Sequence, residues 1–143
     1  MKSTSTKIEL PKFVAIIVTR GDQVLVSLRL KAKKLVGYWQ FPGGAIEYRE
    51  AALLAGKREL REETGLDLPM KRFVRLDKDP RTDQYDYIGH IFNVELLPGE
   101  EPINPEPHKH TDWKWVTKDE ALGIGLIPGT EIYLEQVGQE VAA

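Results

Sequence analysis

A group of acidic residues near the middle of the chain could carry chemistry. The segment KRELREETG, residues 57–65, contains Glu59, Glu62 and Glu63 at spacings of three and four. On a helix these spacings place the three carboxylates on one face, where like charges repel by about 0.2–0.5 kcal/mol per pair. Carboxylate oxygens are ligands that Mg²⁺ and Ca²⁺ prefer. The cluster therefore fits either a divalent-metal site or an exposed, charge-laced helix face in which Arg58 pairs with Glu62.

The bulk composition limits the classes of protein to which this cluster could belong. A chain of 143 residues, 41% hydrophobic and without cysteine, suits one domain spanning residues 1–143, whose metal ligands must be oxygen or imidazole. The net charge of −2 gives no drive toward nucleic acid. The opening segment MKSTSTKIELPK lacks the apolar core of a signal peptide, and no apolar run approaches bilayer length. We therefore expect a cytoplasmic protein that forms no stable nucleic-acid complex and enters no membrane.

Hydrophobic patterning upstream of the cluster predicts the elements that position it. Short β-branched runs predict strands at residues 13–19 and 24–30, paired as an antiparallel hairpin. The Gly/Pro-punctuated segment GYWQFPGG, residues 37–44, is expected to be a loop. Strong helix formers predict a helix over residues 49–64, and Gly65 is a natural stop for it. The cluster then lies on the last turns of that helix.

The remaining elements follow from the downstream pattern. Strands are predicted at residues 70–76, at residues 87–97 and, from the sequence DWKWV, at residues 112–116. The segment DKDPRTDQYD, residues 77–86, is expected to be a loop. A last helix is predicted over residues 130–141, with Thr130 as its cap. The expected class is α+β, with helices on the faces of a sheet.

The acidic cluster is part of a longer pattern. Gly44 is followed after five residues by Glu50 and, after seven more, by the sequence RELREETGL ending at Leu66. This pattern resembles the Nudix box, the signature of the Nudix hydrolases, with every defined position filled. The upstream hairpin, the approach WQFPGG and the W-x-W-V strand are also similar to the family, so the resemblance covers roughly residues 10–137. It implies the Nudix fold, a mixed β-sheet sandwiched between helices.

The resemblance implies roles for the acidic residues of the box. Glu59, Glu62 and Glu63 would be the catalytic and metal-binding carboxylates. Glu59 and Glu63, together with the Gly43 carbonyl, would hold the tighter metal, and Glu62 would serve a second metal or act as general base. Mg²⁺ is the implied cofactor, with Mn²⁺ as an alternative.

Other box residues would be structural. Glu50 is expected in the first turn of the helix, where a carboxylate favours the N-terminal dipole. The resemblance implies that Glu50 and Arg58 fix the loop–helix–loop unit, which Gly65 ends. Leu60 and Leu66 are expected to anchor the unit in the core.

Many family members add a fourth carboxylate from the loop before the last strand. Counting back from Trp115, the comparable place in this chain holds His110, with Asp112 and Glu106 nearby. We select Asp112 as the fourth acidic ligand. His108 and His110 are expected to be loop side chains that face solvent.

Residues between the second strand and the box are candidates for binding substrate. They are Arg29, Trp39, Gln40 and Gly44, together with the basic residues Lys31, Lys33 and Lys34. The basic residues fit a phosphate clamp or a solvated hairpin end. Trp39 could stack on a base or belong to the core, whereas Trp113 and Trp115, two apart on a strand, are expected in the core.

The resemblance implies a hydrolase that acts on the phosphoanhydride bonds of a small nucleotide. The stretch EPINPEPHKHTDWKWV is similar to nucleotide-pool pyrophosphatases. We therefore expect Mg²⁺-dependent, housecleaning-type cleavage of nucleoside or deoxynucleoside triphosphates to monophosphate and pyrophosphate. The Trp and Asp that oxidised-purine sanitising members place after the last strand have no counterpart in ALGIGLIPGTE, which disfavours 8-oxo-guanine specificity.

Alternatives remain open. Within the family, the substrate could be ADP-ribose or a dinucleoside polyphosphate. Outside catalysis, a Nudix module can bind nucleotide or RNA without turnover, although the intact metal-face carboxylates disfavour this reading. A calcium-binding interaction module would need a ligand loop of the EF-hand kind, which the sequence lacks. The sequence also leaves a homodimer open.

Overall fold

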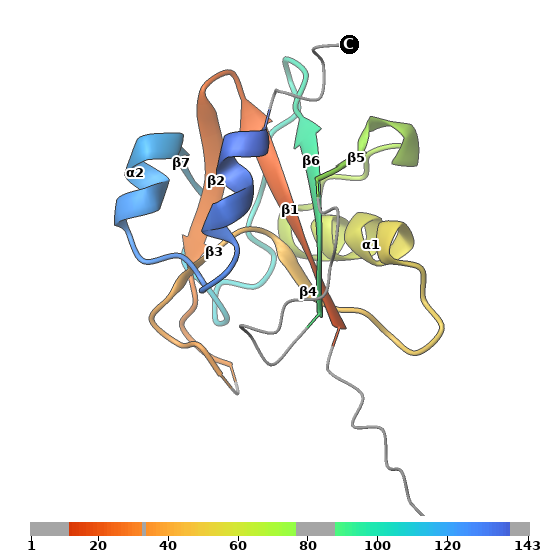
Figure 1. The fold of residues 1–143 in the computed structure, drawn as a ribbon, viewed down its shortest axis with the longest axis horizontal. Coiled ribbons are helices and arrows are strands. Elements are labelled where there is room, and N and C mark those ends of the chain that lie inside the picture. Colours follow the sequence, from red (N-terminus) through yellow and green to blue (C-terminus); the bar gives the residue numbers. More distant parts are fainter. Residues whose placement is uncertain (1–11, 33, 77–87, 138–143) are drawn as a thin grey trace, which may run out of the picture.

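A mixed β-sheet forms the centre of the molecule (Figure 1). The structure is a computed structural model that describes residues 12–32, 34–76 and 88–137. Its strands are β1 Lys12–Arg20, β2 Gln23–Leu28, β3 Trp39–Gln40, β4 Gly43–Ala45, β5 Val74–Arg75, β6 Ile88–Glu95 and β7 Lys114–Thr117. The main order is β3-β2-β1-β6-β5, with β4 paired to β1 and β7 to β2. β1 and β6 run parallel, and the other paired strands are antiparallel.

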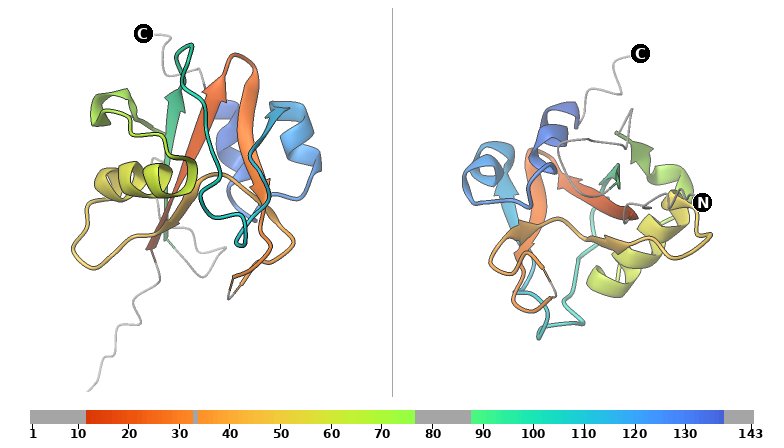
Figure 2. Two further views of the ribbon diagram at one scale, coloured as in Figure 1. Left: turned by 180° about the vertical axis from the view of Figure 1, so that it is seen from behind. Right: turned by 60° about the horizontal axis from the view of Figure 1, so that its bottom comes forward.

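Helices cover both faces of this sheet (Figures 1 and 2). The α-helix α1, Ala52–Thr64, lies on one face, and the short α2, Lys118–Gly123, lies on the other with the 3₁₀ helix η2, Glu131–Gln136. Successive residues of β1 point to opposite faces. Ile16 packs in one core cluster with Leu60 of α1, while Ile17 packs in the other with Leu134 of η2. The expected α+β class, a sheet sandwiched between helices, is confirmed.

The sheet splits along β1. Near its end β1 pairs with β2, at Thr19 with Val24 and at Arg20 with Gln23. At its beginning β1 instead pairs with β4, which takes the place of β2 there. A Cβ atom at Gly43 would lie 2.1 Å from the carbonyl oxygen of Val14, so this crossing requires glycine.

Strands β1, β2, β6 and β7 confirm the expected strands, with small shifts of their ends. The strand expected at residues 70–76 is wrong in its first half, which is a 3₁₀ turn, η1 Met70–Arg72, before the short β5. The segment expected to be only a loop, residues 37–44, contains β3 and enters β4. The loop expected at residues 77–86 lies outside the described residues.

The start of the box helix differs from the expectation. α1 begins at Ala52, not at residue 49, so the expectation that Glu50 lies in its first turn is wrong. Arg49 has φ of 62°, a left-handed conformation that interrupts a helix. Glu50 belongs to a tight turn, in which its backbone N–H donates to the Glu47 carbonyl at 2.9 Å. Gly65 ends the helix with φ of 76°, as expected.

The carboxyl-terminal part also differs. The helix expected over residues 130–141 is the shorter 3₁₀ segment η2, and residues 138–143 lie outside the described residues. The Thr130 hydroxyl donates to the Ile127 carbonyl at 2.7 Å and does not cap a helix. Helix α2 was not predicted, although Thr117 and Glu120 form its capping box. A Thr followed three residues later by Glu is the sequence signal for such a box.

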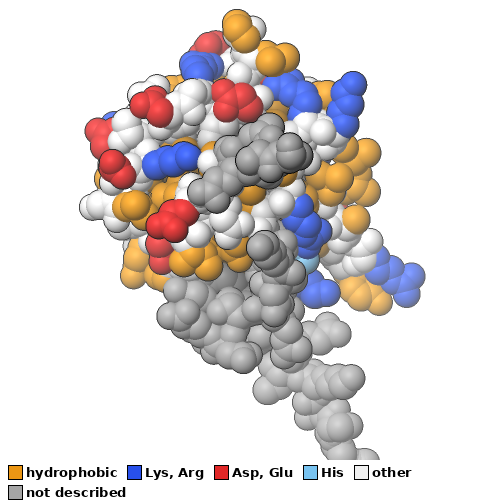
Figure 3. All heavy atoms as spheres, turned by 45° about the horizontal axis from the view of Figure 1, so that its top comes forward, with side chains coloured by type: hydrophobic (Ala, Val, Ile, Leu, Met, Phe, Trp, Pro, Cys, Tyr) orange, Lys and Arg blue, Asp and Glu red, His pale blue; other side chains and the backbone are white. Residues whose placement is uncertain are grey.

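The surface carries both signs of charge. On the face shown in Figure 3, acidic and basic side chains are interspersed among hydrophobic ones. Of the described helices, none is long and apolar enough to cross a membrane.

Candidate active site

A pocket of about 490 Å³ opens beside α1, where the sheet splits. Its walls come from the end of β2, from β3 and β4, from α1 and from the loop before β7. The lining residues are Arg29, Lys31, Ala32, Gln40, Gly43, Gly44, Glu59, Glu63, Glu106, Lys109 and His110. The fold thus brings most of the candidate site residues to one place.

Glu63 is a buried acidic group in the wall of the pocket. Its carboxylate accepts a hydrogen bond of 2.9 Å from the backbone N–H of Gly43. Burial raises the pKa of Glu63 to about 8, and the charges of Glu59 and Glu106 act in the same direction. The Gly43 N–H and the more remote Arg29 oppose this shift. A cation bound beside Glu63 would stabilise the ionised carboxylate and so offset the free-energy cost of burying its charge.

Glu59 lies against strand β4 at Gly44. A Cβ atom at Gly44 would lie 2.6 Å from the carboxyl carbon of Glu59. Any residue other than glycine at this position would therefore displace the Glu59 carboxylate. Burial raises the pKa of Glu59, and an ion pair with Arg58, 2.9 Å from Arg58 Nη1 to Glu59 Oε1, acts against the shift. The Glu59 side chain is 13% exposed.

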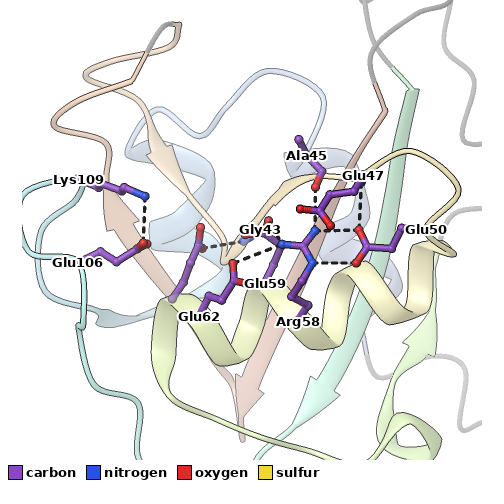
Figure 4. A network of polar contacts seen from close by, with 10 residues as sticks. Gly43, Ala45, Glu47, Glu50, Arg58, Glu59, Glu62, Glu106 and Lys109 are labelled. Carbon is purple, nitrogen blue, oxygen red and sulfur yellow. Dashed lines mark hydrogen bonds and ion pairs between the residues drawn. The ribbon is translucent and has the colours of Figure 1, made fainter.

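Arg58 joins the turn before α1 to the acidic face (Figure 4). It donates to both carboxylate oxygens of Glu50, at 2.7 and 2.8 Å, and to the Ala45 carbonyl at 3.2 Å. This bidentate pair holds the pKa of Glu50 down to about 2 and raises that of Arg58. The pair ties the turn before α1 to the helix.

The third box carboxylate lies apart from the other two. Glu62 is 48% exposed and accepts from Arg58 Nη1 at 3.3 Å, the expected pair at i and i+4. It does not line the pocket. Within residues 12–32, 34–76 and 88–137, no three His, Asp or Glu side chains lie close enough together to form a preformed metal site.

The loop before β7 contributes Glu106 to the pocket. The expected fourth ligand, Asp112, is exposed, does not line the pocket and lies 3.5 Å from Nδ2 of Asn104. Glu106, which the sequence offered without preference, lines the pocket and forms an ion pair of 3.0 Å with Lys109 (Figure 4). The side-chain oxygen of Asn104 accepts a hydrogen bond of 3.0 Å from the backbone N–H of Glu106. An Asn two residues before an acidic residue is the sequence pattern of such a turn, and it was the signal available for Glu106.

His108 is exposed, as expected, but the expectation that His110 faces solvent is wrong. His110 is 2% exposed because its backbone continues the sheet: it bridges to Arg29, and its ring lies 4.7 Å from that of Trp113. Its Nδ1 lies 2.9 Å from the Thr111 carbonyl, which can only accept, so Nδ1 carries the proton. Nε2 is buried without a hydrogen-bond partner among the described residues.

Arg29 and Gln40 form one polar unit in the wall. Arg29 Nη1 donates to Gln40 Oε1 at 2.8 Å, and Nη2 donates to the Lys34 carbonyl at 3.1 Å. Burial lowers the pKa of Arg29, which Glu63 opposes. The Arg29 Nε–H has no partner in the described part of the chain, so the guanidinium retains hydrogen-bonding capacity.

The other candidate side chains separate into pocket and core. Lys31 lines the pocket, Lys34 contributes its carbonyl, and Lys33 lies outside the described residues. Trp39 packs against the core cluster on the α2 side and does not line the pocket, which favours the core interpretation over base stacking. Trp113 and Trp115 pack against the cluster on the α1 side, as expected.

The donor set fits a hard divalent cation. The pocket offers the carboxylates of Glu59, Glu63 and Glu106 and no sulfur ligand, and its partly buried acid at Glu63 lacks a cationic hydrogen-bond donor among the described residues. Oxygen ligands of this kind suit Mg²⁺ or Mn²⁺.

Comparisons with known proteins assign the family. The family model described as "NUDIX domain" matches residues 10–136, and the chain belongs to this family of hydrolases acting on phosphoanhydride bonds. A CTP pyrophosphohydrolase of Escherichia coli is 29% identical over 122 residues, 85% of this chain and 87% of that protein. A putative 8-oxo-dGTP diphosphatase 2 of Mycobacterium tuberculosis is 32% identical over 116 residues, 80% of this chain and 79% of that protein.

A solved structure agrees with this assignment. The MutT NUDIX hydrolase from Burkholderia pseudomallei superposes with a TM-score of 0.73 at 28% identity, over 89% of this chain and 97% of that one. The expected family and the expected fold are therefore both confirmed.

Proposed function

We propose that this protein is a Mg²⁺-dependent pyrophosphohydrolase that cleaves nucleoside or deoxynucleoside triphosphates to monophosphate and pyrophosphate, as a housecleaning enzyme of the cytoplasm. One observation carries the proposal: a single pocket joins the carboxylates Glu59 and Glu63 to the cationic side chains of Arg29, Lys31 and Lys109. The acidic side suits a divalent cation, and the basic side suits a phosphate chain.

The acidic residues take the following roles in the proposal. Glu59, Glu63 and the Gly43 carbonyl hold the tighter cation, and Glu106 takes the place that we expected Asp112 to fill. Glu62 serves a second cation or acts as general base, for which it must leave Arg58. Cations held there would supply charge that neutralises the phosphates and lowers the pKa of a water molecule.

The basic side of the pocket holds the phosphates in the proposal. Arg29 binds a phosphate through the donor capacity that Gln40 and the Lys34 carbonyl leave free, and it is already oriented by those two contacts. Such pre-orientation lowers the entropic cost of aligning the phosphate chain for in-line attack. Gly44 keeps a close approach to the substrate open, because it has no side chain.

The named activities of the relatives support a nucleoside triphosphate as substrate. One relative is a CTP pyrophosphohydrolase, and the other is a putative 8-oxo-dGTP diphosphatase. The segment ALGIGLIPGTE, residues 121–131, lacks the Trp and Asp that we associate with oxidised-purine members. We therefore favour an unmodified nucleobase.

A substrate screen tests the proposal. The purified protein is incubated with Mg²⁺ and CTP, dCTP, ATP, GTP, 8-oxo-dGTP, ADP-ribose or diadenosine tetraphosphate, and the products are separated by anion exchange. We expect one or more triphosphates to give monophosphate and pyrophosphate. Turnover confined to ADP-ribose or the dinucleotide would replace the proposed substrate class, and binding of nucleotides without turnover would indicate a non-catalytic module.

A further inference from the structure

Lys109 has a fixed backbone and a movable side chain at the rim of the pocket. Its carbonyl accepts from the backbone N–H groups of Leu30 and Lys31, at 2.8 and 3.2 Å. The neighbouring His110 carbonyl accepts from Nδ2 of Asn104 at 3.1 Å. These contacts anchor the loop to the end of β2, whereas the Lys109 side chain is 54% exposed and can change its partner without moving the chain.

The present partner of Lys109 is a carboxylate of the pocket. Its Nζ lies 3.0 Å from Oε2 of Glu106, in a pair three residues apart (Figure 4). Glu106 lines the same pocket as the carboxylates of Glu59 and Glu63. Lys109 lines that pocket as well, so its ammonium lies in the same pocket as all three carboxylates.

A divalent cation and the Lys109 ammonium therefore compete for the same negative charge. When a cation occupies the carboxylates, an ammonium beside it is repelled and loses its partner. The pocket then holds a lysine whose strongest remaining attraction is a phosphate group.

We propose that Lys109 is a substrate-binding residue that exchanges partners: it pairs with Glu106 until a divalent cation takes the carboxylates, and it then binds a phosphate oxygen of the substrate. The phosphate half of this inference rests on the proposed function. The metal half does not depend on any nucleotide.

The exchange predicts effects of opposite sign for one substitution. Lys109→Gln removes a competitor of the metal, so the metal-free protein should bind Mn²⁺ more tightly. The same change removes a phosphate ligand, so the metal-loaded protein should bind phosphates less well. For the metal half alone, Lys31→Gln is the matched control, since Lys31 also lines the pocket and is exposed but has no carboxylate partner among the described residues.

Isothermal titration calorimetry measures both halves on the full chain. In the first titration Mn²⁺ alone is added to wild type, K109Q and K31Q. We expect the Kd for Mn²⁺ to fall about threefold to tenfold in K109Q and less than twofold in K31Q, because the effect of a close ion pair exceeds that of a distant charge. In the second titration inorganic pyrophosphate is added at saturating Mn²⁺, and we expect its Kd to rise about fivefold or more in K109Q.

The outcomes are distinguishable. An unchanged or weaker Mn²⁺ affinity in K109Q would overturn the pairing half, and unchanged pyrophosphate affinity would overturn the phosphate half. If the Kd for Mn²⁺ falls by the same factor in K31Q, the effect comes from the change in net charge, and the proposed exchange of partners is wrong. Failure of wild type to hydrolyse any triphosphate would refute the proposed function and leave both titrations decisive for Lys109, since neither contains a nucleotide.

Discussion

At the scale of single residues, Glu63 shows how a residue of the site lowers the stability of the fold. Its carboxyl is held beside two other carboxylates, accepts a backbone N–H and has a pKa raised to about 8. A residue selected for stability alone would not be an ionisable group in such a place. We therefore assign Glu63 to the proposed function of the pocket, and its replacement should lower catalysis and raise the stability of the metal-free protein.

Glu63→Gln should abolish most of the activity. The amide keeps the size of the side chain and can still accept from the Gly43 N–H, but it removes the negative charge that we assign to metal binding. We expect turnover of the preferred triphosphate to fall by at least ~10³ at saturating Mg²⁺. Glu135→Gln, an exposed glutamate of η2, is the control and should retain full turnover. Near-normal turnover by a folded E63Q protein would remove Glu63 from the mechanism.

The same substitution should stabilise the metal-free protein at alkaline pH. Because the pKa of Glu63 is raised above its unfolded value near 4.5, the folded state binds this proton more tightly. Its contribution to stability is present below pH 4.5 and is lost as the pH rises toward 8. We expect metal-free E63Q to exceed wild type at pH 8 by on the order of 2 kcal/mol in urea denaturation, and the difference to vanish at pH 4.5. A wild type that is the more stable protein at pH 8 would contradict the burial argument.

At the scale of elements, strand β4 contains two glycines, Gly43 and Gly44, with different neighbours. A Cβ atom at Gly43 would meet the backbone of β1, whereas a Cβ atom at Gly44 would meet the movable carboxyl end of Glu59. Backbone cannot give way, but a carboxylate can turn aside. The first glycine is therefore required by the fold and the second by the site.

The two alanine variants should separate these requirements. Gly43→Ala should destabilise the protein by about 3 kcal/mol or more, since β4 must leave β1. Gly44→Ala should stay within about 1 kcal/mol of wild type and lose most of the stabilisation by Mg²⁺, because Glu59 is displaced. Thermal denaturation with and without Mg²⁺ measures both. Equal destabilisation of the two variants would show that Gly44 is structural as well.

Local signals explain which elements the sequence could predict. β1 is a continuous β-branched run, and α1 combines strong helix formers with a glycine stop, so both were predictable in kind. The start of α1 was misplaced because the left-handed Arg49 and the ion pair of Glu50 with Arg58 arise only when the turn packs on the helix. β3 and β4 are too short for their own pattern and exist because β2 and β1 offer partners.

The site was predictable where its residues share one helix and not where they come from distant segments. The spacing of Glu59 and Glu63 placed both on one face, and both line the pocket. The choice among Asp112, Glu106 and His110 depends on how the loop before β7 attaches to the end of β2. Periodicity cannot give that attachment, so the sequence favoured Asp112 where the structure favours Glu106 and buries His110.

At the scale of the whole molecule, metal binding should couple to folding. The carboxylates of the pocket come together only in the folded chain, so we expect Mg²⁺ to bind the native state and to stabilise it by mass action. We expect the Tm of the metal-free protein to rise by roughly 5–10 °C at 100 times the Kd for Mg²⁺. Glu59→Gln should reduce this gain by more than half, whereas Glu135→Gln should leave it unchanged. A Tm that is indifferent to millimolar Mg²⁺ would favour a non-catalytic domain.

The identity of the broken bond tests the central claim most directly. The sequence has no Walker-type lysine loop that would grip a terminal phosphate, and the pocket that holds the carboxylates is also lined by Arg29, Lys31 and Lys109, which can bind the β and γ phosphates while the monophosphate departs. Attack of water at the β phosphorus forms a new P–O bond there and breaks the bond to the α-phosphate oxygen, releasing the monophosphate.

The measurement is hydrolysis of the preferred triphosphate with Mg²⁺ in ¹⁸O-labelled water, followed by mass spectrometry of the first-formed products. We expect monophosphate and pyrophosphate, with the label in pyrophosphate alone. Label in the monophosphate would move the attack to the α phosphorus, and orthophosphate with nucleoside diphosphate as primary products would contradict the account.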